Sequence, residues 1–313
     1  MSESVTLSGF DGFPSGWYAI LHISELPKSK PFACIRFGIP LVIWKDSSEV
    51  VVMEDRCPHR SAKLSLGKIC DNKIRCPFHG FEFSKDGSCT HAPEFNKAIP
   101  KLMVKKYPSR VTLDMIWVMF GNPSGVDDIS PLENVFNSFN GNYSFFSKKW
   151  DSYITRCIEN QLDYTHLAEV HKTTIGRNFV MPQNPRFEQT DSSIITYQRD
   201  GDSSPSTIYV YPNSWILNIS DKMKIIAYFV PVSQNQSIIY IFTFRGFLTA
   251  KPIKPIIDFV MNISNKIILK QDQKVVESQA SWNYKLEDEV LMKHDKAIKL
   301  FRNMWKSRQQ KHS

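Results

Sequence analysis

The sequence has no long apolar run. Although 42% of its 313 residues are hydrophobic, a membrane-spanning helix needs about 20 predominantly apolar residues in a row. Polar side chains interrupt the most apolar segment, residues 252–269, at Lys254, Asp258, Asn262, Asn265 and Lys266. Residues 1–14 also lack the basic stretch followed by an apolar one that marks a secretory leader. We therefore expect a soluble, cytoplasmic protein with no membrane anchor.

The sequence also lacks an internal repeat, a low-complexity segment and a clustered basic stripe. It is basic overall, with 39 Lys and Arg against 31 Asp and Glu and a net charge of +8, and its pI is near 9.0. This charge raises the hypothesis of a basic, metal-stabilised nucleic-acid-binding protein. Because the basic residues are spread along the chain and no groove-reading motif is present, we expect no nucleic-acid partner.

Two short segments each combine one thiol with one imidazole. They are Cys57-Pro58-His59 and Cys76-Pro77-Phe78-His79. A Rieske 2Fe-2S cluster needs two thiolates on one iron and two imidazoles on the other, and two such loops can supply them. Zinc is the alternative for two Cys and two His, but a zinc-finger pattern keeps its cysteines in one half and its histidines in the other. We therefore predict a 2Fe-2S cluster at Cys57, His59, Cys76 and His79.

The run Cys57-Pro-His-Arg60, followed by Cys76-Pro-Phe-His-Gly80-Phe-Glu-Phe83, resembles the Rieske domain of the Rieske non-heme iron oxygenases, the ring-hydroxylating oxygenase α subunits. The remaining cysteines are scattered and are expected to be reduced, packed thiols: Cys34, Cys70, Cys89 and Cys157. The resemblance directs attention to the 200 or so residues that follow, where the family carries a second iron.

A second motif, Asn160-x-x-Asp163-x-x-His166-x-x-x-x-His171, resembles the mononuclear iron motif of the same family. Two neutral imidazoles and one carboxylate on one face of Fe(II) leave the opposite face open for O2 and substrate. Positions 166 and 171 would point about 140° apart on a regular helix, so we expect a π-bulge or a break between them. For the histidine pair alone, a solvated polar helix would be the simpler interpretation.

Asp272 is the predicted third ligand. Residues 255–279 have a helical apolar pattern, and Asp272 lies within its apolar stripe, where a carboxylate is costly unless it is paired or bound to metal. The stripe comprises Ile256, Phe259, Val260, Ile263, Ile267, Ile268, Val275 and Val276. The segment also resembles the family's C-terminal ligand segment. Glu277 and Asp258 are the alternatives, and a salt bridge from Asp272 to Lys270 or Lys274 is the non-metal interpretation.

Asp163 has its own role by resemblance. In the family, the Asp three residues before the first iron-binding His links that His to a Rieske His of the neighbouring subunit in a head-to-tail trimer. A carboxylate that accepts from the far nitrogen of a ligating imidazole fixes its tautomer, and a helix would place positions 163 and 166 on one side. A plain surface Asp is the alternative. Asn160, also matched by the motif, is expected beside the ligands.

The resemblance and the strand pattern together predict an α+β protein. Residues 1–124 are expected to form an antiparallel β Rieske domain, with short strands at 17–22, 32–37, 41–44, 50–53 and 115–120. Residues 122–131 are the expected linker. Residues 125–313 are expected to form a catalytic domain of helix-grip fold, an antiparallel sheet with helices at 255–279 and 286–308.

The resemblance implies the terminal oxygenase component of a Rieske monooxygenase. Electrons from NAD(P)H would enter through a separate reductase or ferredoxin, and the basic charge suits an acidic donor. Through the 2Fe-2S cluster they would reach Fe(II), where O2 is activated beside a small aromatic or cyclic substrate. The chain length resembles the α-only branch of hydroxylases and demethylases. A cis-dihydroxylating dioxygenase and a non-catalytic Rieske electron carrier are the alternatives. We expect a homotrimer and pocket walls from residues 173–247; the substrate itself is not predicted.

Overall fold

The computed structural model describes residues 12–47, 49–121, 128–279 and 289–309. They divide into two compact units, one of residues 17–121 and one of residues 12–16 with 128–309. The boundary predicted between residues 124 and 125, and most of the predicted linker, lie outside the described residues. No helix among the described residues is long and apolar enough to cross a bilayer.

The first unit consists of three small sheets whose paired strands run antiparallel. The first sheet contains β1 (Gly16–His22), β12 (Met115–Phe120) and β11 (Ser109–Thr112). The second contains, in order, β10 (Lys106–Tyr107), β4 (Val50–Glu54), β3 (Ile39–Lys45) and β2 (Phe32–Arg36). The third contains β5 (Lys68–Cys70), β6 (Lys73–Arg75), β7 (Glu82–Phe83), β8 (Ser88–Ala92) and β9 (Lys97–Met103). Two short 3-10 helices, η1 (Ile23–Glu25) and η2 (Leu64–Leu66), complete it.

A packed core underlies the two cysteine loops of this unit. Strands β3 and β4 contribute Val42, Trp44, Val51 and Met53, and the third sheet contributes Ile74 and Phe83; all six are buried in one cluster that also contains Cys57 and Cys76. Burial of this apolar surface stabilises the strands at roughly 25 cal/mol per Å². The two thiols are therefore held on a rigid base.

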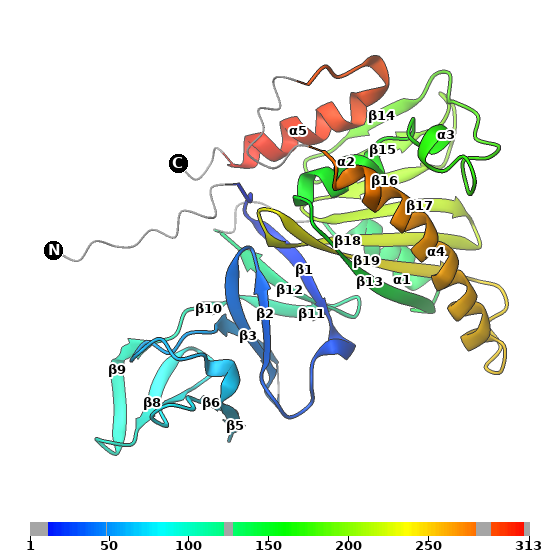
Figure 1. The fold of residues 1–313 in the computed structure, drawn as a ribbon. Coiled ribbons are helices and arrows are strands. Elements are labelled where there is room, and N and C mark those ends of the chain that lie inside the picture. Colours follow the sequence, from blue (N-terminus) through cyan, green and yellow to red (C-terminus); the bar gives the residue numbers. More distant parts are fainter. Residues whose placement is uncertain (1–11, 48, 122–127, 280–288, 310–313) are drawn as a thin grey trace. The chain divides into compact units, whose positions relative to one another are not determined.

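The second unit is built on one seven-stranded antiparallel sheet (Figure 1). Its strands, in order across the sheet, are β13 (Tyr143–Trp150), β19 (Gln236–Arg245), β18 (Met223–Ser233), β17 (Ser214–Ser220), β16 (Thr207–Val210), β15 (Ser193–Tyr197) and β14 (Arg186–Gln189). The helices are α1 (Ser130–Ser138), α2 (Ile154–Leu162), α3 (Leu167–Val170), α4 (Lys254–Val276) and α5 (Lys296–Gln309), with η4 (Lys293–Asp295) preceding α5.

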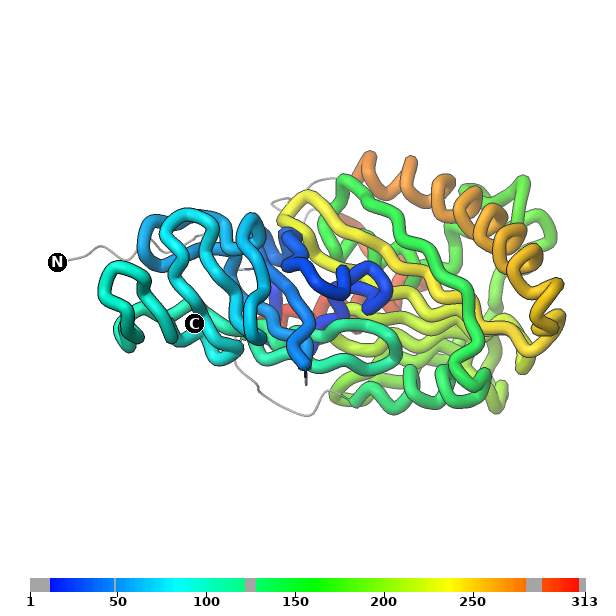
Figure 2. The backbone as a smooth tube through the Cα atoms, turned by 90° about the horizontal axis from the view of Figure 1, so that it is seen from below, coloured from blue at the N-terminus to red at the C-terminus, as the bar shows by residue number. Residues whose placement is uncertain are grey.

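The long helix α4 lies across one face of this sheet, and α1 lies on the other (Figure 2). A sheet gripped by a long helix is the predicted helix-grip arrangement, so the α+β fold class is confirmed. The helix predicted at 255–279 corresponds to α4. The helix predicted at 286–308 begins ten residues later than expected, at Lys296; residues 286–288 of that prediction lie outside the described residues.

The apolar stripe predicted for α4 is confirmed in part: Asp272 and Val276, at its C-terminal end, are buried, but most of its other members are exposed. Ile256, Phe259 and Ile267 are 63%, 66% and 52% exposed. The face toward the sheet instead presents polar groups that have polar partners there. Asp258 pairs with Arg245 at 2.7 Å, Asn262 accepts from Ser144 at 3.2 Å, and Asn265 donates to Thr243 at 2.8 Å. The partners on β13 and β19 decided which face is turned inward, because buried polar groups must be hydrogen-bonded.

Candidate metal centres and the adjoining cavity

The two cysteine loops of the first unit share one backbone pattern. In each, the cysteine N–H donates to the carbonyl five residues on, from Cys57 to Ala62 (2.8 Å) and from Cys76 to Phe81 (2.8 Å). In each, the cysteine carbonyl accepts from the residue four positions on, which is Ser61 in one loop and Gly80 in the other. Ser61 and Gly80, whose N–H groups donate to these carbonyls, have φ of 59° and 75°, the left-handed region that glycine adopts at little cost. Two loops of equal shape therefore face each other.

The thiols and imidazoles of these loops lie at different depths. Cys57 and Cys76 are 1% and 2% exposed, whereas His59 is exposed and His79 is half-buried. The two imidazole rings lie 4.7 Å apart between centroids. Burial raises the pKa of the Cys57 thiol to about 11, and the neighbouring Cys76 adds to that rise. A metal that binds here must displace a proton from a thiol that burial keeps protonated.

The pairing of ligand types in the two loops favours a cluster of two irons over a single zinc ion. Each loop supplies one thiol and one imidazole, and a Rieske cluster takes two thiolates on one iron and two imidazoles on the other.

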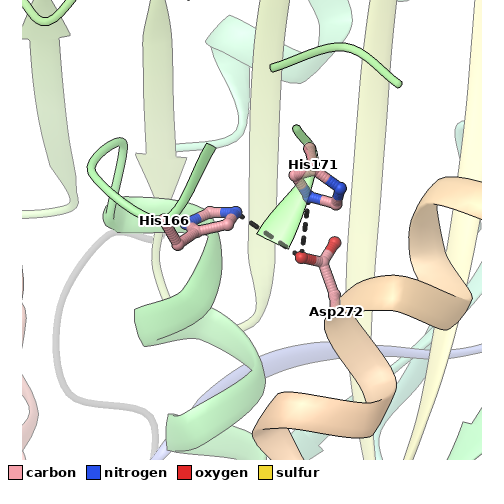
Figure 3. Close-up of side chains that lie close together, drawn as sticks. All are labelled: His166, His171 and Asp272. Atoms are coloured by element: carbon pink, nitrogen blue, oxygen red, sulfur yellow. Dashed lines mark ion pairs between the residues drawn. The ribbon is translucent and has the colours of Figure 1, made fainter. Parts of the chain in front are cut away.

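The second unit brings the three predicted ligands of the mononuclear site together. His166, His171 and Asp272 are the one such group within the described part of the chain whose ligand atoms all lie within 4.8 Å of one another. Oδ1 of Asp272 lies 2.9 Å from Nε2 of His171 and 3.5 Å from Nε2 of His166. Figure 3 shows both imidazoles directed at this one oxygen.

The path of the chain between the two histidines differs from the predicted π-bulge or break. The intervening residues form the single turn of α3, with His166 and His171 as its N-cap and C-cap. The interruption lies earlier, where α2 ends at Leu162. Because the helix is only four residues long, its two flanking residues escape the 140° separation that a longer regular helix would impose.

One buried atom of this group lacks a hydrogen-bond donor. Asp272 is 4% exposed, yet its Oδ1 makes no hydrogen bond of acceptable geometry within the described residues, although Nε2 of His171 is only 2.9 Å away. A buried carboxylate oxygen without a donor is costly. Three ligand atoms that approach one another without mutual hydrogen-bond geometry fit a cation placed among them, and two His with one carboxylate is the donor set of non-heme Fe(II) sites.

His171 is fixed by residues that the sequence analysis missed. Its Nδ1 lies 2.8 Å from Oε1 of Gln271, which also accepts from the Thr174 hydroxyl at 2.8 Å. Burial opposes a charge on His171, but the nearby Asp272 carboxylate and Gln271 amide oxygen outweigh burial and raise the pKa of the imidazole. Gln271 fixes the ring so that Nε2 faces Asp272. The only signal in the sequence was its position next to the predicted ligand.

Asp163 contacts His166, although not for the predicted reason. It is the C-cap of α2 rather than a residue on the same helix as His166. Its Oδ2 lies 3.5 Å from Nδ1 of His166, and its Oδ1 accepts from the backbone N–H and the hydroxyl of Thr165 at 2.6 Å each. Burial raises the pKa of the Asp163 carboxyl, but these contacts outweigh burial and hold it below its usual value.

The alternatives to Asp272 have other partners. Asp258 pairs with Arg245 and Lys254, and Glu277 accepts from the backbone N–H of Asp151 at 2.8 Å. Within the described residues the ion pairs of Asp272 are with the two histidines and not with Lys270 or Lys274. Asn160 lies one turn from the site, and its buried Nδ2 has no acceptor among the described residues.

A cavity of about 630 Å³ adjoins the three side chains. Its walls come from β16–β19, as predicted, but also from residues 161–171 and from α4, where a metal ligand but no cavity wall was predicted. The sheet contributes Trp215, Leu217, Ile225 and Ile241, and α4 contributes Met261 and Ile268. Its size lies within the usual range for small-molecule sites. His166, His171 and Asp272 thus open onto a mostly apolar chamber.

Two family models match the chain. One describes a Rieske [2Fe-2S] domain and matches residues 16–108. The other describes the vanillate O-demethylase oxygenase C-terminal domain and matches residues 150–222. A Rieske domain followed by such a domain defines a class, the Rieske oxygenases. This chain belongs to that family, the Rieske non-heme iron oxygenases.

Individual relatives agree with this assignment. The toluene-4-sulfonate monooxygenase system iron-sulfur subunit TsaM1 of Comamonas testosteroni is 30% identical over 186 residues, 55% of this chain and 50% of its own length. Methylxanthine N1-demethylase NdmA of Pseudomonas putida is 30% identical over 167 residues, 51% and 47% of the two lengths. The chain thus spans about half the length of the curated relatives it matches.

Solved structures share the fold. NdmA of Pseudomonas putida CBB5 superposes with a TM-score of 0.75 at 23% identity, over 96% of this chain and 91% of that chain. Dicamba monooxygenase bound to dicamba superposes with a TM-score of 0.75 at 19% identity, over 97% and 98% of the two chains. At such low identity these similarities describe the architecture alone.

Proposed function

We propose that this chain is the terminal oxygenase component of a Rieske monooxygenase that hydroxylates or oxidatively demethylates a small aromatic or cyclic compound. The observation that carries the proposal is the group of His166, His171 and Asp272, which opens onto a largely apolar cavity in a chain with a Rieske domain. Fe(II) bound by these three side chains would supply the activation of O2. Cys57, His59, Cys76 and His79 would hold the 2Fe-2S cluster.

The chain's own residues have separate tasks in this scheme. Gln271 holds the His171 ring, and Oδ2 of Asp163 lies 3.5 Å from Nδ1 of His166, so that both imidazoles can present their Nε2 atoms to the cation. The apolar walls exclude bulk water and hold the substrate beside the open face. Asp163 also provides the link that would connect His166 to a Rieske His of an adjacent subunit, and it therefore supports a homotrimer.

The electron donor is proposed to be a separate reductase or ferredoxin that uses NAD(P)H. A net charge of +8 favours an acidic partner, since opposite charge steers the encounter. The oxidoreductase NdmD of Pseudomonas putida is 36% identical to this chain over 122 residues. We propose the cytoplasm as the site of action, where NAD(P)H is available. Monooxygenation is favoured over cis-dihydroxylation because matched relatives are named as monooxygenases and demethylases.

Substitution of one predicted ligand tests the proposal. His166→Ala is expected to abolish O2-dependent turnover with a surrogate reductase and to lower iron from about three to about two per chain, while the visible and EPR spectra of the Rieske cluster remain. The control is Glu169→Ala, an exposed side chain on the intervening turn of α3, which should retain iron and turnover. Loss of the cluster spectrum in the His166 variant, or full turnover without His166, would contradict the two-site proposal.

A further inference from the structure

The cavity beside the proposed iron site has no cationic wall. Of its lining residues within the described part of the chain, none is Lys or Arg. Besides the carboxylates and imidazoles of the site, its polar side chains are uncharged: Gln161, Tyr164, Thr207, Trp215, Ser264 and Asn265. The other lining residues are aliphatic or thioether side chains. An organic anion that enters this chamber therefore meets no side chain that can neutralise it.

The acidic side chains that line the cavity also offer no favourable contact to an anion. Asp163 and Asp272 both line the cavity, and no Lys or Arg does so within the described residues. The acidic side chains there would repel an organic anion rather than neutralise it. Transfer of an ionised carboxylate or sulfonate from water into an apolar chamber without a counter-charge is unfavourable.

The neutral polar groups of the cavity can still orient a ligand. Trp215 lines it and is 6% exposed, and its buried Nε1–H has no acceptor within the described residues. Asn265, on α4, also lines the cavity; its uncharged amide donates to the Thr243 hydroxyl at 2.8 Å. Buried donors need acceptors, and a carbonyl, ether or sulfonyl oxygen on a ligand would supply one to Trp215.

We propose, building on the oxygenase function proposed above, that the substrates are uncharged, largely apolar ring compounds with a neutral acceptor group, and that organic anions are excluded. Family membership does not decide this point. Toluene-4-sulfonate, for which one relative is named, is an anion, whereas a methylxanthine ring, for which another is named, bears no such fixed charge. Because no Lys or Arg lines the cavity within the described residues, we expect this chain to bind uncharged ligands.

Matched pairs of ligands test the proposal by binding alone. The protein, loaded with both iron centres and kept anaerobic, is titrated by calorimetry with toluene-4-sulfonamide against toluene-4-sulfonate, and with naphthalene-2-carboxamide against naphthalene-2-carboxylate. The neutral member of each pair is expected to bind at least about tenfold more tightly, because only the anion loses its hydration without compensation. Equal or tighter binding of the anions overturns the proposal, and so does failure of both neutral ligands to bind.

Two substitutions and one control test whether the preference for neutral ligands arises in the cavity. Ile219→Lys introduces a cation at a cavity residue that is already 49% exposed, and is expected to tighten anion binding about tenfold. Ile263→Lys, on the outward face of α4 and 43% exposed, is the matched control and should leave the preference unchanged. Trp215→Phe keeps a ring but removes the N–H, and is expected to weaken carboxamide binding about three- to tenfold.

The oxygenase function is measured separately. Selective binding of neutral ligands without any O2-dependent product would support the inference about the cavity and overturn the proposed oxygenase activity. O2-dependent product from anionic substrates only would support the activity and overturn the inference. The two proposals can therefore fail independently.

Discussion

At the scale of single residues, Asp272 is the side chain whose environment most requires a cation. It is buried on α4, its nearest polar neighbours are two imidazoles, and one of its oxygens has no hydrogen-bond donor within the described residues. A carboxylate in this position without a partner would cost several kcal/mol. Bound Fe(II) would offset this cost, because the carboxylate and the two imidazoles would then all donate to one cation.

Substitution of Asp272 tests whether this residue, rather than another carboxylate near it, is a metal ligand. Asp272→Ala is expected to remove the mononuclear iron and all turnover, because two imidazoles alone hold Fe(II) poorly. Glu277→Ala, one turn and a half further along, loses the contacts to the Asp151 N–H and the Gln273 amide and should retain iron. Iron analysis by inductively coupled plasma, together with sulfide analysis, measures both. An Asp272 variant that purifies with its full iron content would show that the third ligand is another residue.

Gln271 offers a second test at this scale. Gln271→Leu removes the acceptor of the His171 Nδ1–H and is expected to lower the affinity for mononuclear iron about 10- to 100-fold. The control is Gln273→Leu, two residues along α4, where the exposed amide bonds to the Lys149 carbonyl and Glu277. Competition for Fe(II) with a chelator of known affinity measures the change. Equal iron affinities of the two variants would argue against an orienting role for Gln271.

At the scale of elements, a network of four charges joins α2 to α5. Glu159 on α2 accepts from Arg302 on α5 at 2.7 Å and from Arg156 at 3.1 Å, and Glu289 pairs with both arginines. Arg156 and Glu159 are 5% and 6% exposed. Because α2 ends at Leu162, directly before Asp163, the network holds the element from which the site residues emerge.

Removal of one cation from this network should destabilise the second unit. Arg302→Met is expected to lower the free energy of unfolding by about 3 kcal/mol, since it leaves a buried carboxylate partly unpaired. Lys299→Met, at an exposed position on the same helix, should change it by less than about 0.5 kcal/mol. Urea titration followed by circular dichroism gives both values. Equal stability of the two variants would show that the network contributes no net stabilisation.

The same network gives a pH dependence with a defined sign. Burial raises the pKa of Glu289, but its bonds to Arg156 and Arg302 outweigh burial and lower it below the ordinary 4.5. A lowered pKa in the folded state contributes stability that is present above pH 4.5 and is lost as the pH falls through the folded value. The difference between the wild type and Arg302→Met should therefore narrow below about pH 4.5.

At the scale of the whole molecule, two units of different construction share one chain. The first is a set of small antiparallel sheets that present two metal-binding loops, and the second is a seven-stranded sheet with a cavity between it and α4. Electron transfer from one to the other requires a path that the proposed function routes through Asp163 and an adjacent subunit. The proposed electron transfer therefore requires assembly into an oligomer as well as folding of the chain.

Asp163→Asn tests that route. The substitution keeps the shape of the side chain but removes the charge that stabilises both imidazoles, so both metals should remain bound. Transfer from the prereduced cluster to the iron site should slow by orders of magnitude, as each 1.4 kcal/mol added to a barrier is about tenfold in rate. Stopped-flow reoxidation with O2 and substrate measures it, with Asp191→Asn, an exposed carboxylate, as control. A normal rate in the Asp163 variant, or a purely monomeric protein in sizing experiments, would eliminate the intersubunit route.

The sequence by itself determined the family and the fold class, because both depend on local patterns. Ligand residues at short, fixed separations form motifs that can be recognised in the sequence alone. Alternating apolar residues indicate strands even when the strands that pair with them are unknown. The pairing of His166 with His171, and the choice of Asp272 from 31 acidic residues, were predictions of this kind, and the structure brings the three side chains to one point.

The tertiary structure alone decided which side of α4 faces the sheet. Its apolar residues suggested an inward stripe, but partners from β13 and β19 drew the polar face inward and left Ile256 and Phe259 exposed. Gln271 and the cavity walls from α4 depend on that choice. The pattern of residues within one helix shows how polar each of its faces is. The partners of its buried polar groups lie on other elements, 13 to 118 residues away along the chain, and become neighbours only on folding.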